Sequence, residues 1–221
     1  MLSCFLSHKQ DERTTPFHNS TWNSPCVADI KLGQQTWDSE CDARKRRTHE
    51  DIDRASTSAQ LGWRLGGVVL GGASSTPLNL GKNYGVFVPC ARAVEPLLAF
   101  LTGDPWHYGC ETPTVPCPPS LQSVEAEVVG DRCRRIVARL REIEAFFALG
   151  TYTAFATSVL VAYDAQGAGR ASVVLIDYAH IWRAAECTED SGALAGVRSL
   201  IALLSAVAED PSAVLASHRH D

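Results

Sequence analysis

An acid and an amine placed two residues apart on one short segment could divide the work of phosphoryl transfer. The segment Pro25–Gly33 has apolar residues at positions 26, 28, 30 and 32, which is the pattern of a half-buried strand. Because side chains alternate along a strand, we expect Asp29 and Lys31 on the same face. The carboxylate could orient or deprotonate a hydroxyl acceptor, and the ammonium could neutralise phosphate charge. An ordinary ion pair on a strand edge is the alternative.

A second acidic position follows an apolar run in the segment Ile176–His180. The residues 171–177 are predicted to form a strand, and Asp177 stands at its end. One or two carboxylates together with nucleotide phosphates are a common way to hold Mg²⁺ in proteins. His180, three residues later, could donate a hydrogen bond to a substrate or relay a proton. The alternative is a turn in which Asp177 caps the strand and His180 is structural.

The only concentrated cationic run is Arg44–Arg47, inside the charge-dense stretch 38–55. Two unit charges about 4 Å apart repel by roughly 4 kcal/mol at an effective dielectric of about 20. Such crowding is costly unless the cations are solvated or meet an anion, so the run could bind phosphate groups. A solvated helix or loop face and a nuclear-localisation signal are the alternatives.

Composition places the chain among globular proteins, with 45% hydrophobic and 20% charged residues over 221 positions. The net charge of −5 disfavours general nucleic-acid binding, which needs a net basic face. Eight cysteines without a zinc-type spacing are typical of a reducing compartment. No apolar stretch reaches the ~20 residues that span a bilayer. We therefore expect a protein of the nucleus and/or cytoplasm with no stable membrane insertion, and the oligomeric state stays open.

Hydrophobic periodicity predicts the elements that must position these residues. The expected elements, in chain order, are a strand over 25–32, a strand over 61–70, a helix over 90–101, a helix over 129–147, a hairpin formed by 157–163 and 171–177, and a helix over 191–207. This order favours an α+β fold over a doubly wound one. Residues 1–24 are expected to be a flexible lead-in and residues 209–221 a flexible tail.

Six segments in a fixed order carry recognisable motifs, which are Pro25–Gly33, Thr57–Arg64, Tyr84–Gly85, Thr157–Leu160, Ile176–His180 and Asp190–Ile201. Together they resemble the motifs of the inositol polyphosphate kinase family, and most closely those of inositol polyphosphate multikinases. The family's P-x-x-x-D-x-K-x-G motif is intact in Pro25–Gly33, and its I-D-F-A-H motif resembles Ile176–His180. The short spacer between Gly33 and Leu61 is also similar to multikinases. The resemblance implies a kinase-like α+β fold, of which residues 25–208 would form mainly the C-terminal, inositol-binding lobe.

The resemblance also implies a role for each matching residue. Asp29, Lys31 and His180 would be catalytic, with Asp29 orienting the acceptor hydroxyl and His180 close to it. Asp177 would ligate the Mg²⁺ that accompanies ATP, and Ser158 would lie near that site. The ring phosphates of the substrate would meet a set of cations, which are Lys45, Arg46, Arg47 and Lys82. The implied partners are ATP and soluble inositol polyphosphates.

The chain departs from the family at its start. The family places an N-terminal lobe, with a strand lysine and an acidic hinge for ATP, before the P-x-x-x-D-x-K-x-G motif, whereas 24 residues precede Pro25 here. Those residues would be at most a remnant of that lobe. The expected function is an ATP- and Mg²⁺-dependent kinase acting on inositol tris- and tetrakisphosphates. The alternative is a truncated or degenerate protein that binds inositol phosphates without catalysis, and the printed chain alone is expected to turn over ATP weakly or not at all.

Overall fold

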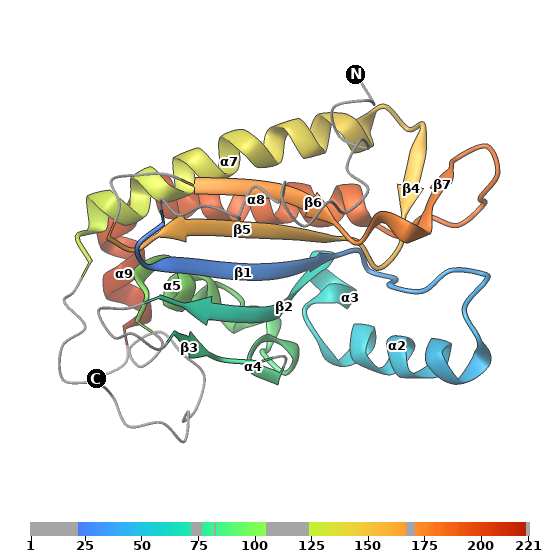
Figure 1. Cartoon of the computed structure of the whole chain (residues 1–221), viewed down its shortest axis with the longest axis horizontal. Helices are drawn as coiled ribbons and strands as arrows, with labels where there is room; N and C mark the ends of the chain where they lie inside the picture. Colours follow the sequence, from blue (N-terminus) through green and yellow to red (C-terminus); the bar gives the residue numbers. More distant parts are fainter. Residues whose placement is uncertain (1–21, 72–76, 82, 105–123, 167–170, 220–221) are drawn as a thin grey trace.

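A five-stranded antiparallel sheet forms the centre of the protein (Figure 1). The computed structural model describes residues 22–71, 77–81, 83–104, 124–166 and 171–219. Along the sheet the order is β3-β2-β1-β5-β6. The strands are β1 (Pro25–Leu32), β2 (Trp63–Leu70), β3 (Leu78–Asn79), β5 (Ser158–Asp164) and β6 (Ala171–Ile176).

One face of this sheet is packed against helices. The even-numbered residues of β1, from Cys26 to Leu32, are almost fully buried, as the alternation in the sequence predicts. They join a single core with the apolar sides of three helices. These helices are α5 (Val94–Thr102), α7 (Ala126–Ala148) and α8 (Ala193–Glu209). The other face carries Val27, Asp29 and Lys31, is only half-buried, and is called the half-buried face below.

A helical arm connects β1 to β2 and lies beyond one end of the sheet (Figure 1). It consists of α2 (Ala43–Ala55) and the short α3 (Ser58–Leu61). Asp42 caps α2, because its carboxylate accepts hydrogen bonds from the backbone N–H groups of Arg44 and Lys45. This cap starts a regular helix directly before the basic run, so the cations are spread around a helix surface.

Shorter elements complete the described part of the chain. A two-stranded sheet pairs β4 (Tyr152–Ala154) with β7 (Ile181–Arg183), next to the 3-10 turn η2 (Tyr178–His180). The remaining elements are α4 (Asn83–Val86), η1 (Cys90–Arg92) and α9 (Pro211–His218). No single helix in the described ranges is long and apolar enough to cross a membrane, although the bent pair α8–α9 meets the length and composition criteria together.

The expected α+β architecture is confirmed, and the structure adds elements that periodicity did not predict. The two strands, the hairpin and the helices over 129–147 and 191–207 are present with slightly shifted bounds. Helix α2 was not predicted, because its charged sequence has little apolar periodicity. In the segment 209–221, expected to be a flexible tail, Asp210 accepts a hydrogen bond from the N–H of Ala213 and starts α9, whose Leu215 is buried. At the other end, Ser24 is already held by Asp164, so order begins before Pro25.

Two glycines let the helical arm touch α8 directly. A Cβ atom on Gly196 would lie 1.9 Å from the carbonyl oxygen of Gly62, which is far inside contact distance. Gly62 ends α3 in the left-handed conformation, with φ of 71°. Its carbonyl also accepts a hydrogen bond from the N–H of Gly33, directly after β1. The contact therefore joins the end of β1, the arm and α8 at one point.

Gly196→Ala is expected to lower the free energy of unfolding by at least about 2 kcal/mol, because backbone atoms would have to move to admit the methyl group. The measurement is urea unfolding followed by circular dichroism. Gly67→Ala is the matched control, since a Cβ there meets nothing within 4 Å. It should change the free energy by no more than about 0.5 kcal/mol. Equal effects of the two substitutions would contradict the proposed contact.

Candidate active site

The register of the sheet brings Asp29, Lys31 and Ser158 to the same face. Asp29 lies opposite Leu160, and Lys31 lies opposite Ser158 on β5. Directly opposed residues of antiparallel strands project to the same side, so all of them belong to the half-buried face. Ser158 in turn lies opposite Ile176 on β6. This row ends one residue before Asp177.

Asp29 and Ser158 each hold a buried polar atom without a partner. Oδ1 of Asp29 and Oγ of Ser158 are shielded from solvent and make no hydrogen bond among the described residues. Gly66 is left out of the β1–β2 pairing, and a Cβ there would lie 3.1 Å from Cγ of Asp29. The chain thus keeps space beside this carboxylate. A buried acceptor or donor without a partner is unfavourable by about 1–3 kcal/mol, which a bound ligand could remove.

Asp177 stands in a strained and exposed position at the end of β6. Its φ of 58° lies in the left-handed region, which is uncommon for residues other than glycine. Neighbouring strands are about 4.8 Å apart. The register therefore places Asp177 about two strands from Lys31, at the same end of the sheet as Lys31 and Ser158.

The oxygens of Asp177 and Ser158 are of the type that Mg²⁺ prefers. Ser158 lies opposite Ile176, the residue before Asp177, and its Oγ makes no hydrogen bond among the described residues, so it is suited to binding a metal ion together with Asp177. In the described part of the chain, no group of three or more His, Cys, Asp or Glu side chains is arranged to hold a metal ion. Mg²⁺ bound through one or two carboxylates and nucleotide phosphates does not require such a group.

His180 is paired with a buried carboxylate from the other end of the sequence. Its Nδ1 lies 2.9 Å from Oδ2 of Asp38, and Nε1–H of Trp182 donates to the same oxygen over 3.1 Å. Burial alone would raise the pKa of Asp38. The hydrogen bonds from Trp182 and His180, and then the charge of His180, outweigh burial and lower this pKa below its ordinary value. Asp38 is therefore ionised at neutral pH and accepts Nδ1–H, which leaves Nε2 of His180 for another group.

A cavity of about 180 Å³ lies between the loop after β1, α2 and His180. Lys45 reaches it from α2, and Ala156 reaches it from the loop before β5. The carbonyl oxygen of Ala156 accepts a hydrogen bond of 2.9 Å from Nζ of Lys31, which ties Lys31 to the cavity wall. The residues that line the cavity are Thr36, Trp37, Asp38, Glu40, Cys41, Asp42, Lys45, His49, Phe155, Ala156 and His180.

The structure separates the cations of the basic run. Lys45 lines the cavity, while the guanidinium of Arg46 stacks over the ring of Trp37, 3.8 Å from its centroid, and pairs with Glu50 at 2.9 Å. Arg47 is exposed and lies about 200° around the helix from Lys45, so it points away from the cavity. Lys82, the fourth expected cation, lies outside the described residues.

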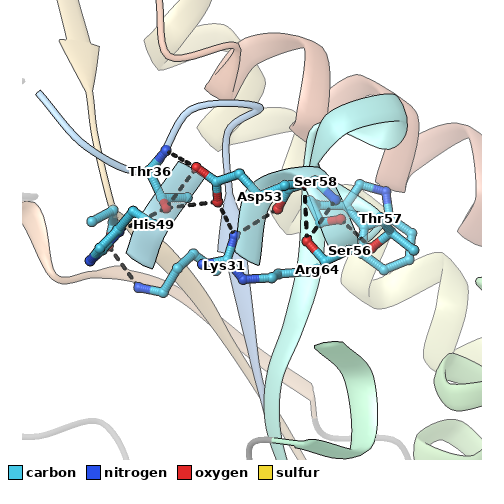
Figure 2. Close-up of polar contacts among 10 residues, drawn as sticks. Lys31, Thr36, His49, Asp53, Ser56, Thr57, Ser58 and Arg64 are labelled. Carbon is cyan, nitrogen blue, oxygen red and sulfur yellow. Dashed lines mark hydrogen bonds and ion pairs between the residues drawn. The ribbon is translucent and has the colours of Figure 1, made fainter. Parts of the chain in front are cut away.

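A buried polar network holds α2 in place (Figure 2). Nη1 of Arg64 on β2 lies 2.6 Å from Oδ1 of Asp53, and each side chain is only 7% exposed. The backbone N–H and hydroxyl of Thr36 also donate to Asp53, and Nη1 of Arg64 reaches Oγ of Ser58. His49 continues the network through Thr36.

Sequence reasoning missed several of these residues, which are Thr36, Asp38, His49, Asp53 and Arg64. A partial signal was present, because Lys45, His49 and Asp53 follow one another at intervals of four and must share a helix face once α2 is known to be helical. Asp38 gave no such signal, since 142 positions separate it from His180. A second described cavity, of about 300 Å³, lies between α7, β4 and the start of α8 and contains none of the predicted site residues.

The fold and this site define a kinase-like α+β protein with a polar cavity, lined by one lysine, two histidines and three carboxylates, and a sheet face that carries an unsatisfied carboxylate oxygen. Residues 18–205 match the family described as inositol polyphosphate kinase. The chain therefore belongs to the inositol polyphosphate kinase family, as the motifs indicated.

Curated relatives are multikinases. The inositol polyphosphate multikinase IPK2 of Oryza sativa subsp. indica is 31% identical in an alignment 173 residues long that covers 72% of this chain and 53% of the rice protein. The inositol polyphosphate multikinase of Schizosaccharomyces pombe is 41% identical over 46 residues, which are 21% of this chain and 17% of the yeast protein. The chain thus spans about half the length of the rice protein.

Solved structures confirm the fold. The inositol phosphate multikinase Ipk2 from S. cerevisiae, in complex with ADP and Mn²⁺, superimposes with a TM-score of 0.64 at 18% identity, over 84% of this chain and 79% of that one. A second structure of an inositol phosphate multikinase superimposes with a TM-score of 0.61, also at 18% identity, over 85% of this chain and 81% of that one.

Asp38→Ala is expected to change the tautomer of His180. With Asp38 present the neutral ring carries its proton on Nδ1, and without this acceptor the ring should relax toward a mixture of tautomers. The measurement is a side-chain ¹H–¹⁵N correlation spectrum at a pH where the ring is neutral. Asp51→Ala, which removes an exposed carboxylate of α2, is the control and should leave the His180 signals unchanged. An identical His180 spectrum in Asp38→Ala and wild type would contradict the pairing.

Proposed function

We propose that the cavity between α2 and His180 binds a soluble inositol polyphosphate. The observation that supports this proposal is that Lys45, His49 and His180 line one cavity. Lys31 is hydrogen-bonded to Ala156, which also lines this cavity. Nζ of Lys45 and Nε2 of both imidazoles make no hydrogen bond within the described ranges, so they are available to phosphate and hydroxyl groups. The relatives' names, inositol polyphosphate multikinase, support this substrate class.

The half-buried face beside this cavity is proposed to serve phosphoryl transfer from ATP. Phosphoryl transfer depends mainly on positioning and on charge stabilisation. Asp29 would orient the acceptor hydroxyl or take its proton, since Oδ1 has no partner and the carboxylate occupies the strand next to Ser158. Lys31 would offset negative charge on the phosphoryl group during transfer. His180 would contact the inositol ring near the reacting hydroxyl.

Asp177 and Ser158 would hold Mg²⁺ at the end of the sheet where Lys31, Ser158 and Ile176 lie side by side. The ion, when bound with ATP, supplies charge neutralisation of the phosphate oxygens. The ADP and Mn²⁺ in the S. cerevisiae complex support the use of a nucleotide and a divalent cation in this family. Binding of inositol phosphate is proposed for this chain.

Lys45→Ala is expected to weaken the binding of inositol trisphosphate about tenfold, because one charge-assisted hydrogen bond is lost. The dependence of affinity on salt should become shallower for the same reason. Isothermal titration calorimetry at two salt concentrations measures both effects. Arg54→Ala removes an exposed cation from the other end of α2 and is the matched control, with affinity unchanged. Absence of binding by wild type would overturn the proposed function.

In a form of the protein that turns over ATP, Asp177→Ala is expected to lower kcat by at least about 10²-fold, the usual effect of losing one preorganised electrostatic group. Transfer of labelled phosphate from ATP to inositol trisphosphate measures this rate. Affinity for inositol trisphosphate in the absence of nucleotide should stay as in wild type. Unchanged turnover would remove Asp177 from the metal-binding role.

A further inference from the structure

His49 is a second imidazole in the proposed substrate cavity. It lies one turn after Lys45 and one turn before Asp53, on the side of α2 that faces the cavity and the buried network. In Figure 2, one edge of the ring faces Thr36, and the rest of the ring points away from it. The direction of the hydrogen bonds along this network decides which ring nitrogen carries the proton.

The carboxylate of Asp53 fixes that direction. Asp53 is buried and paired with Arg64, and an ionised carboxylate only accepts hydrogen bonds. The hydroxyl of Thr36 has one proton, and its oxygen lies 2.8 Å from Oδ1 of Asp53, so the proton is donated there. Oγ1 of Thr36 must then accept at its other contact, the 3.0 Å distance to Nδ1 of His49. The neutral ring is therefore protonated on Nδ1 and has a free lone pair on Nε2.

The surroundings keep this ring neutral. Burial lowers the pKa of His49 below its ordinary value, and the charges of Lys45 and Arg64 act in the same direction, against the opposing effect of Asp53. No described residue donates a hydrogen bond to Nε2 of His49. At neutral pH the cavity therefore holds a hydrogen-bond acceptor at His49 and a strong donor, the ammonium of Lys45, one helical turn away.

These two groups favour opposite substituents of a ligand. Lys45 attracts phosphate, whereas an unprotonated Nε2 accepts from a hydroxyl and meets only acceptor oxygens on an ionised phosphate. We propose that His49 is a specificity-determining residue whose Nε2 accepts a hydrogen bond from a free hydroxyl of the inositol ring and disfavours phosphate at that ring position. This inference rests on the proposed function and adds to it a rule for which inositol phosphates the cavity accepts.

The test compares inositol trisphosphate with inositol hexakisphosphate, which has no free hydroxyl. His49→Ala is expected to lower the affinity for the trisphosphate about fivefold, the usual effect of one lost neutral hydrogen bond, and to leave or raise the affinity for the hexakisphosphate. His49→Lys should raise the hexakisphosphate affinity about tenfold by adding a cation. Thr48→Ala, at an exposed neighbouring position of α2, is the control and should leave both affinities unchanged.

Thr36 provides an independent test through the tautomer. Thr36→Val removes the hydroxyl that holds Nδ1–H, so part of the preference for the trisphosphate should be lost, and Thr36→Ser should restore it. In wild type, the side-chain ¹⁵N signals of His49 should show protonated Nδ1, and the Nε2 signal should shift when the trisphosphate is added. This spectrum needs no substitution, so it tests the inference even where a variant fails to fold.

Failure of the His49 inference and failure of the proposed function give different experimental results. If wild type binds the trisphosphate but His49→Ala lowers both affinities equally, or neither, His49 does not determine specificity and the proposed function stands. A spectrum with protonated Nε2 in the free protein would overturn the inference in the same way. If wild type binds neither compound, the proposed function and this inference fail together.

Discussion

The ion pair between Asp53 and Arg64 is the interaction on which the candidate site depends. It joins α2, which carries Lys45 and His49, to β2, the neighbour of the strand that carries Asp29 and Lys31. Both charges are buried, so loss of one partner would leave an uncompensated charge, at a cost of about 3–5 kcal/mol. Thr36 and Ser58 satisfy further atoms of the pair, which is the condition under which a buried ion pair is tolerated. A well-packed apolar pair could give equal stability, but it would not orient His49 through Thr36.

A second constraint acts on the other side of the arm. Gly62 and Gly196 allow backbone to approach backbone, and the left-handed Gly33 places its N–H on the carbonyl of Gly62. The arm is thus fixed by polar contacts at α2 and by close packing at α3. Because both ends are held, the N-terminal half of α2 can carry several exposed cations without support from a core of its own.

The sequence predicted the sheet and the long helices well, because burial on one side imposes a regular apolar period on β1, α7 and α8. It predicted Asp29 and Lys31 on one face, since strand alternation is a local rule. Ser158 joins this face through the pairing of β1 with β5, which are far apart in the sequence, so its position beside Lys31 was not predicted. The pairing of Asp38 with His180 could not be predicted in this way, because it depends on how the loop after β1 folds over the end of β6. The separation of Lys45 from Arg47 required the helix α2, which has too few apolar residues to show a period.

The site combines two kinds of chemistry on adjacent surfaces. The cavity offers a cation and two imidazoles whose Nδ1 atoms are held by carboxylates, directly at Asp38 and through Thr36 at Asp53. The sheet face offers a carboxylate and a hydroxyl with unsatisfied buried atoms. The proposed function requires a phosphorylated ring in the cavity to present a hydroxyl toward that face for transfer from a nucleotide.

The most direct measurement of this account is a crystal structure of the protein with bound inositol trisphosphate. We expect electron density for the ring between Lys45, His49 and His180, with a hydroxyl directed toward Asp29. Density in the larger cavity beside Leu194, or on the exposed outer side of α2 at Arg47, would contradict it.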